Sequence, residues 1–194
     1  MRTALFTTEQ LLDAAEQLVA DGGPSALTIE RLTRATGAST GSIYHRFRSR
    51  SIIAAQLWIR AVASFHAGFA VAVEEADPRS AAVNAALHSV RWSREHPSTA
   101  RMLLLSAEAD MIADDLPEPW TRRVADANKP LLASLRKMSR RLYGSAERQA
   151  LQRVGLALID LPRGAVHRHL LARKDIPLEV ETLLASAVSA VLNG

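Results

Sequence analysis

The sequence "ATGASTGSIYHRF" (residues 35–47) carries the clearest structural pattern in this chain of 194 residues. Gly37 separates two short stretches of helical periodicity, and a glycine permits the positive φ that a sharp helix end requires. Ser39 stands where a second helix would begin, and a serine at that place accepts a hydrogen bond from the first helical turn. The segment therefore predicts two short helices joined by a tight turn, which is the helix-turn-helix arrangement.

The residues on either side extend this prediction. Thr28 is the expected N-cap of the first of the two helices, and Ile43 and Phe47 lie four residues apart on the face of the second that we expect to be buried. An earlier amphipathic helix is expected from about Thr8, as its N-cap, to Ala20. The glycines and proline of "DGGPSA" end that helix.

The net charge of the chain is concentrated around this motif. The whole chain carries +4, and the segment from Thr28 to Arg50 carries the same net charge because it holds five arginines and one glutamate. A local basic field attracts polyanions such as nucleic acids and speeds their capture. The alternative is a solvated helix surface on which arginine replaces lysine, which is scarce throughout the chain.

The side chains that follow the turn suit contact with a nucleic acid. Thr40, Gly41 and Ser42 are small, so the backbone at the start of the helix can approach base edges and phosphates. Tyr44 can donate a hydrogen bond to a phosphate oxygen, and His45 can reach a phosphate or a base edge. An ordinary half-buried core position remains the alternative for both.

Composition narrows the class of protein further. The chain has no cysteine, which excludes disulfides, thiolate metal sites and a cysteine nucleophile. The N-terminal "MRTALFTTEQLLDAAEQ" reaches acidic residues before any signal-peptide core, and we find no apolar run of about 18 residues that would cross a membrane. We expect a cytoplasmic protein without membrane contact.

The periodic segments along the chain are all helical, so the predicted fold class is all-α with about nine helices. A long fourth helix, which begins near Ser49, is expected to join the first three helices to a bundle of longer ones. Pro130 and Pro162 are expected to bend or interrupt two of the later helices.

The segment from Leu27 to Trp58 resembles the N-terminal DNA-binding domain of the TetR family of bacterial transcriptional regulators. The positions that match the pattern of that family are Thr28, Gly37, Ser39, Gly41, Tyr44, Phe47 and Arg50. The positions that depart from it are Thr33, Thr36, Ala38 and Arg46, together with an arginine instead of lysine at position 50.

The resemblance implies a helix-turn-helix DNA-binding domain over residues 1–50 and an effector-binding and dimerisation domain over residues 51–194. It implies a ligand-responsive regulator, most often a repressor, that is released by a small apolar or amphipathic effector. One recognition helix buries little surface, so two copies in a homodimer are expected on a palindromic site in double-stranded DNA. The expected DNA-binding residues are Thr28, Ser39, Thr40, Gly41, Ser42, Tyr44, His45, Arg46 and Arg50.

Two further groups of apolar residues are assigned to the effector-binding and dimerisation domain. Large aromatic and methionine side chains suit a pocket for an apolar ligand, with an ordinary core as the alternative: Trp58, Phe65, Phe69, Trp92, Met102, Met111 and Trp120. Apolar stripes on the last two helices are the expected dimer interface, with packing inside one chain as the alternative: Leu158, Leu161, Leu184, Val188, Val191 and Leu192.

Two other classes of function stay open at this stage. An enzyme is the weaker alternative, because no common catalytic or nucleotide-binding motif occurs and His167 and His169 point about 200° apart on a helix, a poor metal pair. No metal or cofactor is therefore expected. A helical protein-interaction module without DNA binding is the stronger alternative, although the core of an ordinary protein interface is depleted of charge.

Overall fold

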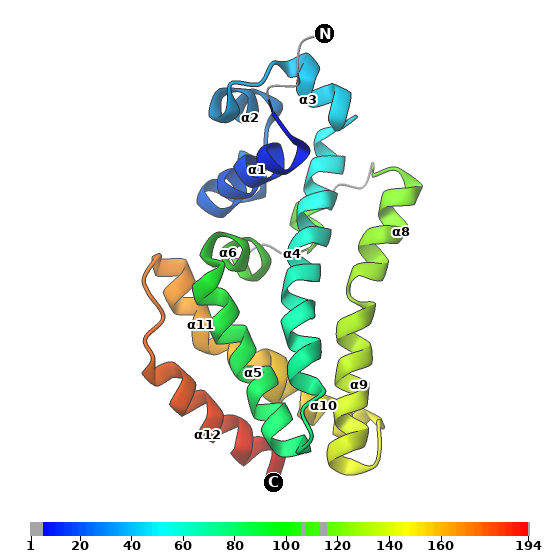
Figure 1. Ribbon diagram of the computed structural model, residues 1–194, viewed down its shortest axis with the longest axis vertical. Helices are drawn as coiled ribbons and strands as arrows, with labels where there is room; N and C mark the ends of the chain where they lie inside the picture. Colours follow the sequence, from blue (N-terminus) through cyan, green and yellow to red (C-terminus); the bar gives the residue numbers. More distant parts are fainter. Residues whose placement is uncertain (1–5, 106–107, 113–115, 194) are drawn as a thin grey trace. The chain divides into compact units, whose positions relative to one another are not determined.

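The computed structural model describes residues 6–105, 108–112 and 116–193, and all regular secondary structure in these residues is helical (Figure 1). The elements in chain order are α1 (Thr8–Gly22), η1 (Pro24–Ala26), α2 (Ile29–Thr36), α3 (Thr40–Arg46), α4 (Arg50–Val73), α5 (Pro78–Glu95), α6 (Pro97–Leu105), α7 (Glu108–Met111), α8 (Glu118–Ala127), α9 (Lys129–Tyr143), α10 (Arg148–Gly155), η2 (Leu156–Asp160), α11 (Leu161–Ala172) and α12 (Glu179–Asn193). Two groups of elements can each be counted as one interrupted helix, namely α8 with α9, and α10 with η2 and α11. If the four-residue α7 is also set aside, the described residues hold nine α-helices, in agreement with the sequence. The all-α fold class is confirmed.

These helices form two compact units. Unit 1 comprises residues 1–61 and 98–126, and unit 2 comprises residues 62–97 and 127–194. The long helix α4 therefore contributes residues to both units. The units differ from the two domains expected on either side of residue 50, because residues 51–61 and 98–126 pack with the N-terminal helices. The assignment of DNA binding to residues 1–50 stays a prediction.

In unit 1, α1 packs against α2 and η1, and α2 packs against α3. The N-cap of α1 is Thr7 and not the expected Thr8. The Thr7 hydroxyl accepts a hydrogen bond from the backbone N–H of Gln10, and the Gln10 side chain accepts one from the backbone N–H of Thr7, at 3.2 and 2.8 Å. This reciprocal arrangement satisfies two backbone donors that a helix start leaves unpaired, which explains why α1 begins here.

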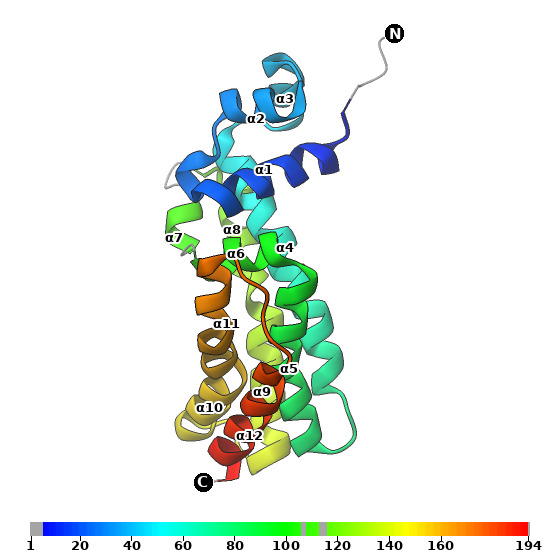
Figure 2. The same cartoon turned by 90° about the vertical axis from the view of Figure 1, so that its left-hand side faces the viewer.

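In unit 2, α5 is the central helix, and α9, η2, α11 and α12 all pack against it (Figures 1 and 2). The start of α5 carries four alanines that are fully buried, Ala81, Ala82, Ala85 and Ala86. Side chains of this size allow the neighbouring helices to approach α5 closely. The apolar core of unit 2 is therefore built around α5.

The end of α5 also holds the chain that leads into α12. Arg94 donates hydrogen bonds to the carbonyl oxygens of Ile176 and Pro177 at 2.9 and 2.8 Å, and it forms an ion pair with Glu181. Burial raises the pKa of Glu181, but hydrogen bonds from Arg94 and Arg91 outweigh burial and leave this pKa below its ordinary value. The carboxylate therefore stays ionised in this position.

The two prolines expected to disturb long helices lie at interruptions. Pro130 is in the first turn of α9, which Asn128 separates from α8. Pro162 is in the first turn of α11, directly after the π-helical η2. A proline has no N–H for the carbonyl four residues earlier, so the regular hydrogen-bond ladder stops just before each of them.

Helix α4 departs from an expectation of the sequence analysis. Among the residues that the structure describes, it is long and apolar enough to cross a membrane by length and composition. The core helix of a globular protein meets the same criterion, and 56% of the most apolar window of α4 is buried inside the protein. This finding is weak evidence for a membrane span.

The apolar stripes predicted to form a dimer interface lie mainly inside the chain's own core. Leu158, Leu184, Val188 and Leu192 are at most 4% exposed, whereas Leu161 and Val191 are half-buried. The four buried side chains fill the contacts of η2 and α12 with the rest of unit 2 and are not available to a partner. The physical reason is that one helix presents two faces, and the more apolar face packs inside the monomer.

Candidate nucleic-acid interface

The turn between α2 and α3 has the geometry that the sequence predicts. Gly37 ends α2 with a φ of 76°, in the left-handed region that favours glycine. Thr28 and Ser39 cap the two helices, because their hydroxyls accept hydrogen bonds from the backbone N–H groups of Arg31 and Ser42 at 3.1 and 3.2 Å. Both hydroxyls therefore hold helix starts, a role other than the DNA contact expected for them.

The inner face of the motif is fully buried. Ile43 and Phe47 on and after α3, and Leu32 on α2, are all 0% exposed. Ala38 lies in the turn and is also buried. These contacts fix one side of the seven-residue α3, which is too short to be stable alone.

The opposite side of α3 is open to solvent. Thr40, Gly41, Tyr44 and His45 are exposed, and we call these four residues the recognition face. A Cβ built on Gly41 meets no atom within 4 Å, so the space beside this backbone is free for a ligand. Tyr44 is 47% exposed, which excludes the alternative of a half-buried core position for its ring.

Two of the predicted DNA-contacting arginines point into the protein. Arg46 donates to the backbone carbonyl and the hydroxyl of Ser42 at 3.1 and 2.9 Å and to the carbonyl of Phe6 at 2.6 Å. Arg50 donates to the carbonyls of Leu27 and Pro24 at 2.6 and 2.8 Å. Both are half-buried. Sequence reasoning missed the bonds to Phe6, Leu27 and Pro24 because these acceptors are main-chain groups distant in the sequence.

The remaining arginines of the basic segment differ from these two. Arg34 is exposed and pairs with Glu30, one helical turn away, at 2.7 Å. Arg31 and Arg48 are exposed, and within the described part of the chain their side chains form no hydrogen bond or ion pair. Neither is among the expected DNA-binding residues, although the sequence places Arg48 with Arg46 and Arg50 as a charge that follows the turn.

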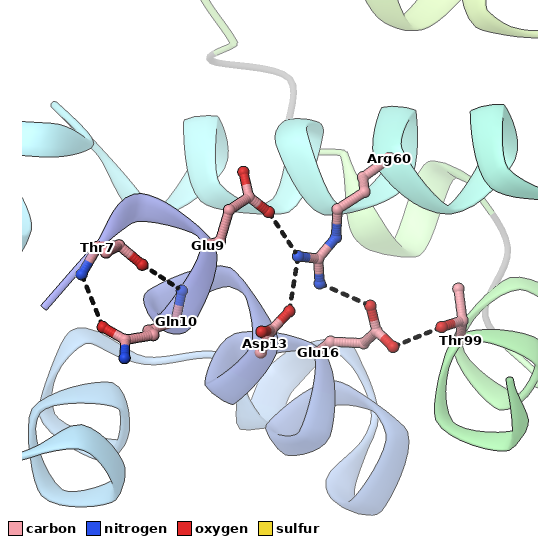
Figure 3. A network of polar contacts seen from close by, with 7 residues as sticks. All are labelled: Thr7, Glu9, Gln10, Asp13, Glu16, Arg60 and Thr99. Carbon is pink, nitrogen blue, oxygen red and sulfur yellow. Dashed lines mark hydrogen bonds and ion pairs between the residues drawn. The ribbon is translucent and has the colours of Figure 1, made fainter.

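A second polar feature of unit 1 joins α1 to α4. Arg60 on α4 lies among three carboxylates of α1, Glu9, Asp13 and Glu16, at 3.2, 2.8 and 2.8 Å (Figure 3). We call these four residues the arginine clasp. Burial lowers the pKa of Arg60, but hydrogen bonds to Glu16 and Asp13 outweigh burial and raise it above its ordinary value.

The arginine clasp extends to α6. Thr99 donates a hydrogen bond to the second oxygen of Glu16 (Figure 3), and the neighbouring Ser98 donates to Gln17 at 3.0 Å. Three helices of unit 1 are thus held together around one guanidinium group. The sequence signal for this network was the spacing of the three acids of α1, which places them on one helix face.

The seven residues predicted to line an effector pocket are divided between the two units. Unit 1 contains Trp58, Met102, Met111 and Trp120, and unit 2 contains Phe65, Phe69 and Trp92. Trp58, Met102 and Met111 are buried, whereas Trp120 is half-buried under the guanidinium of Arg123 at 4.2 Å. The structure therefore does not bring all seven into one compact unit.

The three residues in unit 2 do form a cluster. The ring centroid of Phe65 lies 5.8 Å from that of Phe69, 5.4 Å from that of Trp92 and 5.3 Å from that of His88. A Cβ on Gly68 would lie 2.3 Å from the His88 ring, so only glycine allows this approach to α4. The His88 Nε2 lies 2.9 Å from the Phe65 carbonyl oxygen, which holds the ring there.

His66 is the polar residue next to this aromatic cluster. It is 7% exposed, and its Nδ1 has no hydrogen-bond partner among the described residues. Burial lowers its pKa, and burial also lowers the pKa of His88. Both rings are therefore neutral near pH 7, and the Nδ1 of His66 is a buried polar atom available to a neutral ligand group.

Other kinds of site have less support in the described residues. A surface cavity of about 340 Å³ lies beside Arg79, Val83 and Asn84 of α5 and Ser189 of α12, and none of the predicted pocket residues lines it. No group of three or more histidine, aspartate or glutamate side chains within the described residues could hold a metal ion.

Comparison with known proteins agrees with this geometry. Residues 11–57 match the family model described as bacterial regulatory proteins, tetR family. Among curated proteins, none matches the sequence. The matched segment begins within α1 and ends within the first half of α4, so it contains the whole helix-turn-helix and its buried anchors.

Several solved structures share the fold over nearly the whole chain. The TetR family transcriptional regulator PfmR from Thermus thermophilus has a TM-score of 0.70 at 18% identity, with 98% of each chain covered. The transcriptional regulator FadR from Bacillus subtilis, in complex with stearoyl-CoA, has a TM-score of 0.68 at 15% identity, with 96% of this chain and 97% of that one covered. SmeT, the repressor of the Stenotrophomonas maltophilia multidrug efflux pump SmeDEF, has a TM-score of 0.67 at 17% identity, with 96% and 90% covered.

The family match and the geometry of the turn between α2 and α3 define the class of module in unit 1, a helix-turn-helix of the kind found in DNA-binding proteins. The likeness to the solved structures shows the fold alone at these identities, whereas the family match rests on the helix-turn-helix sequence itself. The match to the family model of tetR bacterial regulatory proteins covers residues 11–57, about a quarter of the chain.

Proposed function

We propose that this chain is a cytoplasmic repressor that binds a palindromic operator as a homodimer and is released by a small apolar or amphipathic effector. The observation that carries the proposal is the recognition face, Thr40, Gly41, Tyr44 and His45, which is exposed on a helix whose opposite side is fully buried. Such a helix can enter a major groove without loss of core packing.

Dimerisation follows from the small surface of one recognition helix. A single helix-turn-helix module gives too little contact for selective binding, so two modules on one duplex are required. Unit 2 offers a surface for this contact, because Leu156, Leu171, Leu178 and Leu183 are all exposed. Leu156, Leu171 and Leu183 lie on η2, α11 and α12, and Leu178 directly precedes α12. Large exposed apolar side chains that form one patch are typical of a protein interface. We place the dimer contact on this exposed leucine face, in place of the buried stripes of η2 and α12.

The effector class is suggested by the aromatic cluster of unit 2. Phe65, Phe69 and Trp92 would contact an apolar group, and His66 would offer one hydrogen bond to a neutral polar group. FadR from Bacillus subtilis, a protein of the same fold, was solved in complex with stearoyl-CoA, which is an amphipathic molecule. An amphipathic ligand with a long apolar part is therefore the first choice.

Release from DNA requires that the effector bind the state with low DNA affinity much more tightly than the state that binds DNA. A shift from 99% bound to 1% bound needs about a 10⁴-fold difference in affinity of the ligand for the two states. We propose that the effector changes the direction of α4 and therefore the spacing of the two recognition helices. Helix α4 is suited to this because it is one continuous helix with residues in both units.

In vitro selection of bound duplexes from a random library tests DNA binding, palindromy and spacing together. We expect an enriched inverted repeat whose half-sites are about one helical turn, 34–36 Å, or a comparable distance apart. Binding should weaken steeply as salt rises, because several phosphates are neutralised. Failure to enrich any duplex at low salt would contradict the proposal and favour the protein-interaction alternative.

The effector part of the proposal has a separate test. Stearoyl-CoA, titrated against the complex with the selected duplex, is expected to release the DNA, and His66→Phe is expected to weaken that release without a change in DNA affinity. Exposed His167 gives the matched control, His167→Phe. Release that is equally strong in both variants would remove His66 from the effector site.

A further inference from the structure

Four of the five arginines between Thr28 and Arg50 divide into two groups by what their guanidinium groups contact, and the fifth, Arg34, pairs with Glu30. Arg46 and Arg50 are half-buried and donate to main-chain carbonyls of other elements. Arg31 and Arg48 are exposed, and within the described residues they have no polar partner. These four arginines carry the same charge, but the two pairs have different surroundings in the structure.

Arg46 links the recognition helix to the start of α1. Its Nη1 donates to Ser42 within α3, and its Nη2 donates to the carbonyl of Phe6, forty residues earlier. Phe6 directly precedes Thr7, the N-cap of α1. Ile43 and Phe47 fix the inner side of α3 by packing, and Arg46 adds a polar tie from the same short helix to α1.

Arg50 forms the corresponding link at the start of α4. Its Nε and Nη2 donate to the carbonyls of Leu27 and Pro24, at the turn that precedes α2. Leu27 is 1% exposed, so its carbonyl needs a protein partner. A planar guanidinium presents two donor nitrogens in a fixed fork to these acceptors, whereas a lysine offers one nitrogen on a shorter side chain and does not reproduce both bonds in this geometry.

We propose that Arg46 and Arg50 are positioning residues that orient the recognition face, and that Arg31 and Arg48 provide the phosphate contacts of this segment. The inference rests on the proposed function and deepens it. Direct reading of base edges requires a helix held to within about half an ångström, whereas a phosphate contact tolerates more movement. Loss of a positioning residue therefore reduces selectivity between sequences, and loss of a phosphate contact weakens binding to all sequences equally.

The test compares full-length variants on two duplexes, the selected operator and a scrambled sequence of the same composition. Arg46→Met and Arg50→Met are each expected to reduce the ratio of the two dissociation constants about tenfold, the size of one lost base contact, with an unchanged salt slope. Arg48→Met and Arg31→Met are expected to weaken both complexes by the same factor. They should also reduce the slope of log K against log salt by about 0.9 for each half-site.

Lysine substitution separates geometry from charge. Arg46→Lys keeps the charge but cannot bond Ser42 and Phe6 together, so we expect it to resemble Arg46→Met in selectivity. All comparisons are made below the melting temperature of the least stable variant, so that global unfolding does not cause the change in DNA selectivity. Wild-type behaviour of Arg46→Lys, or a reduced salt slope with unchanged selectivity in Arg46→Met, would overturn the inference.

The inference and the proposed function fail in different ways. If the wild-type protein selects no duplex, the proposed function fails. The tie itself is then tested without DNA, because Arg46→Met should speed hydrogen exchange in α3 and Arg48→Met should not. If the wild type binds selectively and Arg46→Met matches Arg48→Met in every measurement, the inference alone is wrong.

Discussion

At the scale of single residues, the recognition face depends on the missing side chain of Gly41 as well as on the side chains beside it. Gly41 leaves open space beside the backbone of α3, and a methyl group there would meet no protein atom. A glycine inside a helix lowers stability relative to alanine, and the packing around position 41 does not require a glycine. The remaining physical reason for a glycine at position 41 is that it lets the backbone come close to another molecule.

The change Gly41→Ala should therefore have effects of opposite sign on stability and on DNA binding. We expect the free energy of unfolding to rise by about 0.5–1 kcal/mol, because alanine loses less conformational entropy in a helix. We expect roughly tenfold weaker binding to the selected duplex, the size of one disturbed base contact. Urea denaturation and fluorescence anisotropy measure the two effects.

The control for this prediction is Ala133→Gly on the exposed face of α9, which makes the reverse change outside the recognition face. It should lower stability by a similar amount and leave DNA affinity unchanged. Equal affinity of Gly41→Ala and the wild type would show that the open space beside Gly41 is not used by DNA.

The buried His66 and the half-buried His88 make stability depend on pH. Burial lowers the pKa of His66 and His88 below the ordinary value of 6.5, so the unfolded chain takes up protons at a higher pH than the folded one. Stability is unaffected by these groups above pH 6.5 and falls as the pH decreases below it. The slope contributed by each histidine is at most about 1.4 kcal/mol per pH unit.

Thermal denaturation between pH 7.5 and pH 5.5 measures this linkage. We expect His66→Gln to flatten the decrease in melting temperature with acidification, because one of the two groups is removed. His167→Gln changes an exposed histidine and should leave the curve as in the wild type. A wild-type curve in the His66→Gln variant would exclude this residue from the linkage.

At the scale of elements, the arginine clasp decides how α1, α4 and α6 are held in unit 1. The Arg60 side chain is 28% exposed, so solvent screens its ion pairs less than those of an exposed arginine. Three carboxylates around one guanidinium also repel one another if that guanidinium is removed. The clasp is therefore worth more than the usual surface ion pair.

The change Arg60→Met keeps an unbranched apolar stem and removes the charged guanidinium group. We expect a loss of about 1–2 kcal/mol in the free energy of unfolding, between the values typical of exposed and of buried ion pairs. Arg122→Met removes an exposed ion pair with Glu118 in α8 and should cost less than about 0.5 kcal/mol. Equal losses in the two variants would mean that the clasp contributes no more than a surface pair.

At the scale of the whole molecule, the proposed function requires two chains. The exposed leucine face of unit 2, Leu156, Leu171, Leu178 and Leu183, is the surface proposed for their contact. The buried stripes beside it are needed for the core and cannot serve both purposes. A substitution on the exposed face should therefore separate assembly from folding.

The change Leu183→Arg should convert the dimer into a monomer with wild-type helix content, because a charge at the centre of an apolar contact has no partner. Leu183 is 71% exposed in the single chain, so the change does not disturb the core. Sedimentation velocity measures the state of assembly, and we expect operator affinity to fall with it.

The matched control for assembly is Val71→Arg on α4, where the wild-type side chain is 72% exposed. It introduces the same charge at an equally exposed apolar position outside the proposed contact, and it should remain dimeric. A dimeric Leu183→Arg variant would place the interface elsewhere on the molecule.

The sequence alone determined the local features of this protein, because they depend on neighbouring residues. The caps Thr28 and Ser39, the turn at Gly37 and the buried pair Ile43 and Phe47 all follow from hydrogen bonds and packing within a few residues, and the structure confirms each. The all-α class follows in the same way from helical periodicity.

Only the tertiary structure decided which side chains are free to contact another molecule. Arg46 and Arg48 look equivalent in the sequence, but the carbonyl of Phe6 engages the first and leaves the second exposed. Leu183 and Leu184 are likewise adjacent and equally apolar, but α12 turns one outward and buries the other against unit 2. The physical reason is that burial and main-chain acceptors come from segments distant in the chain, and periodicity does not show which of two apolar faces meets them.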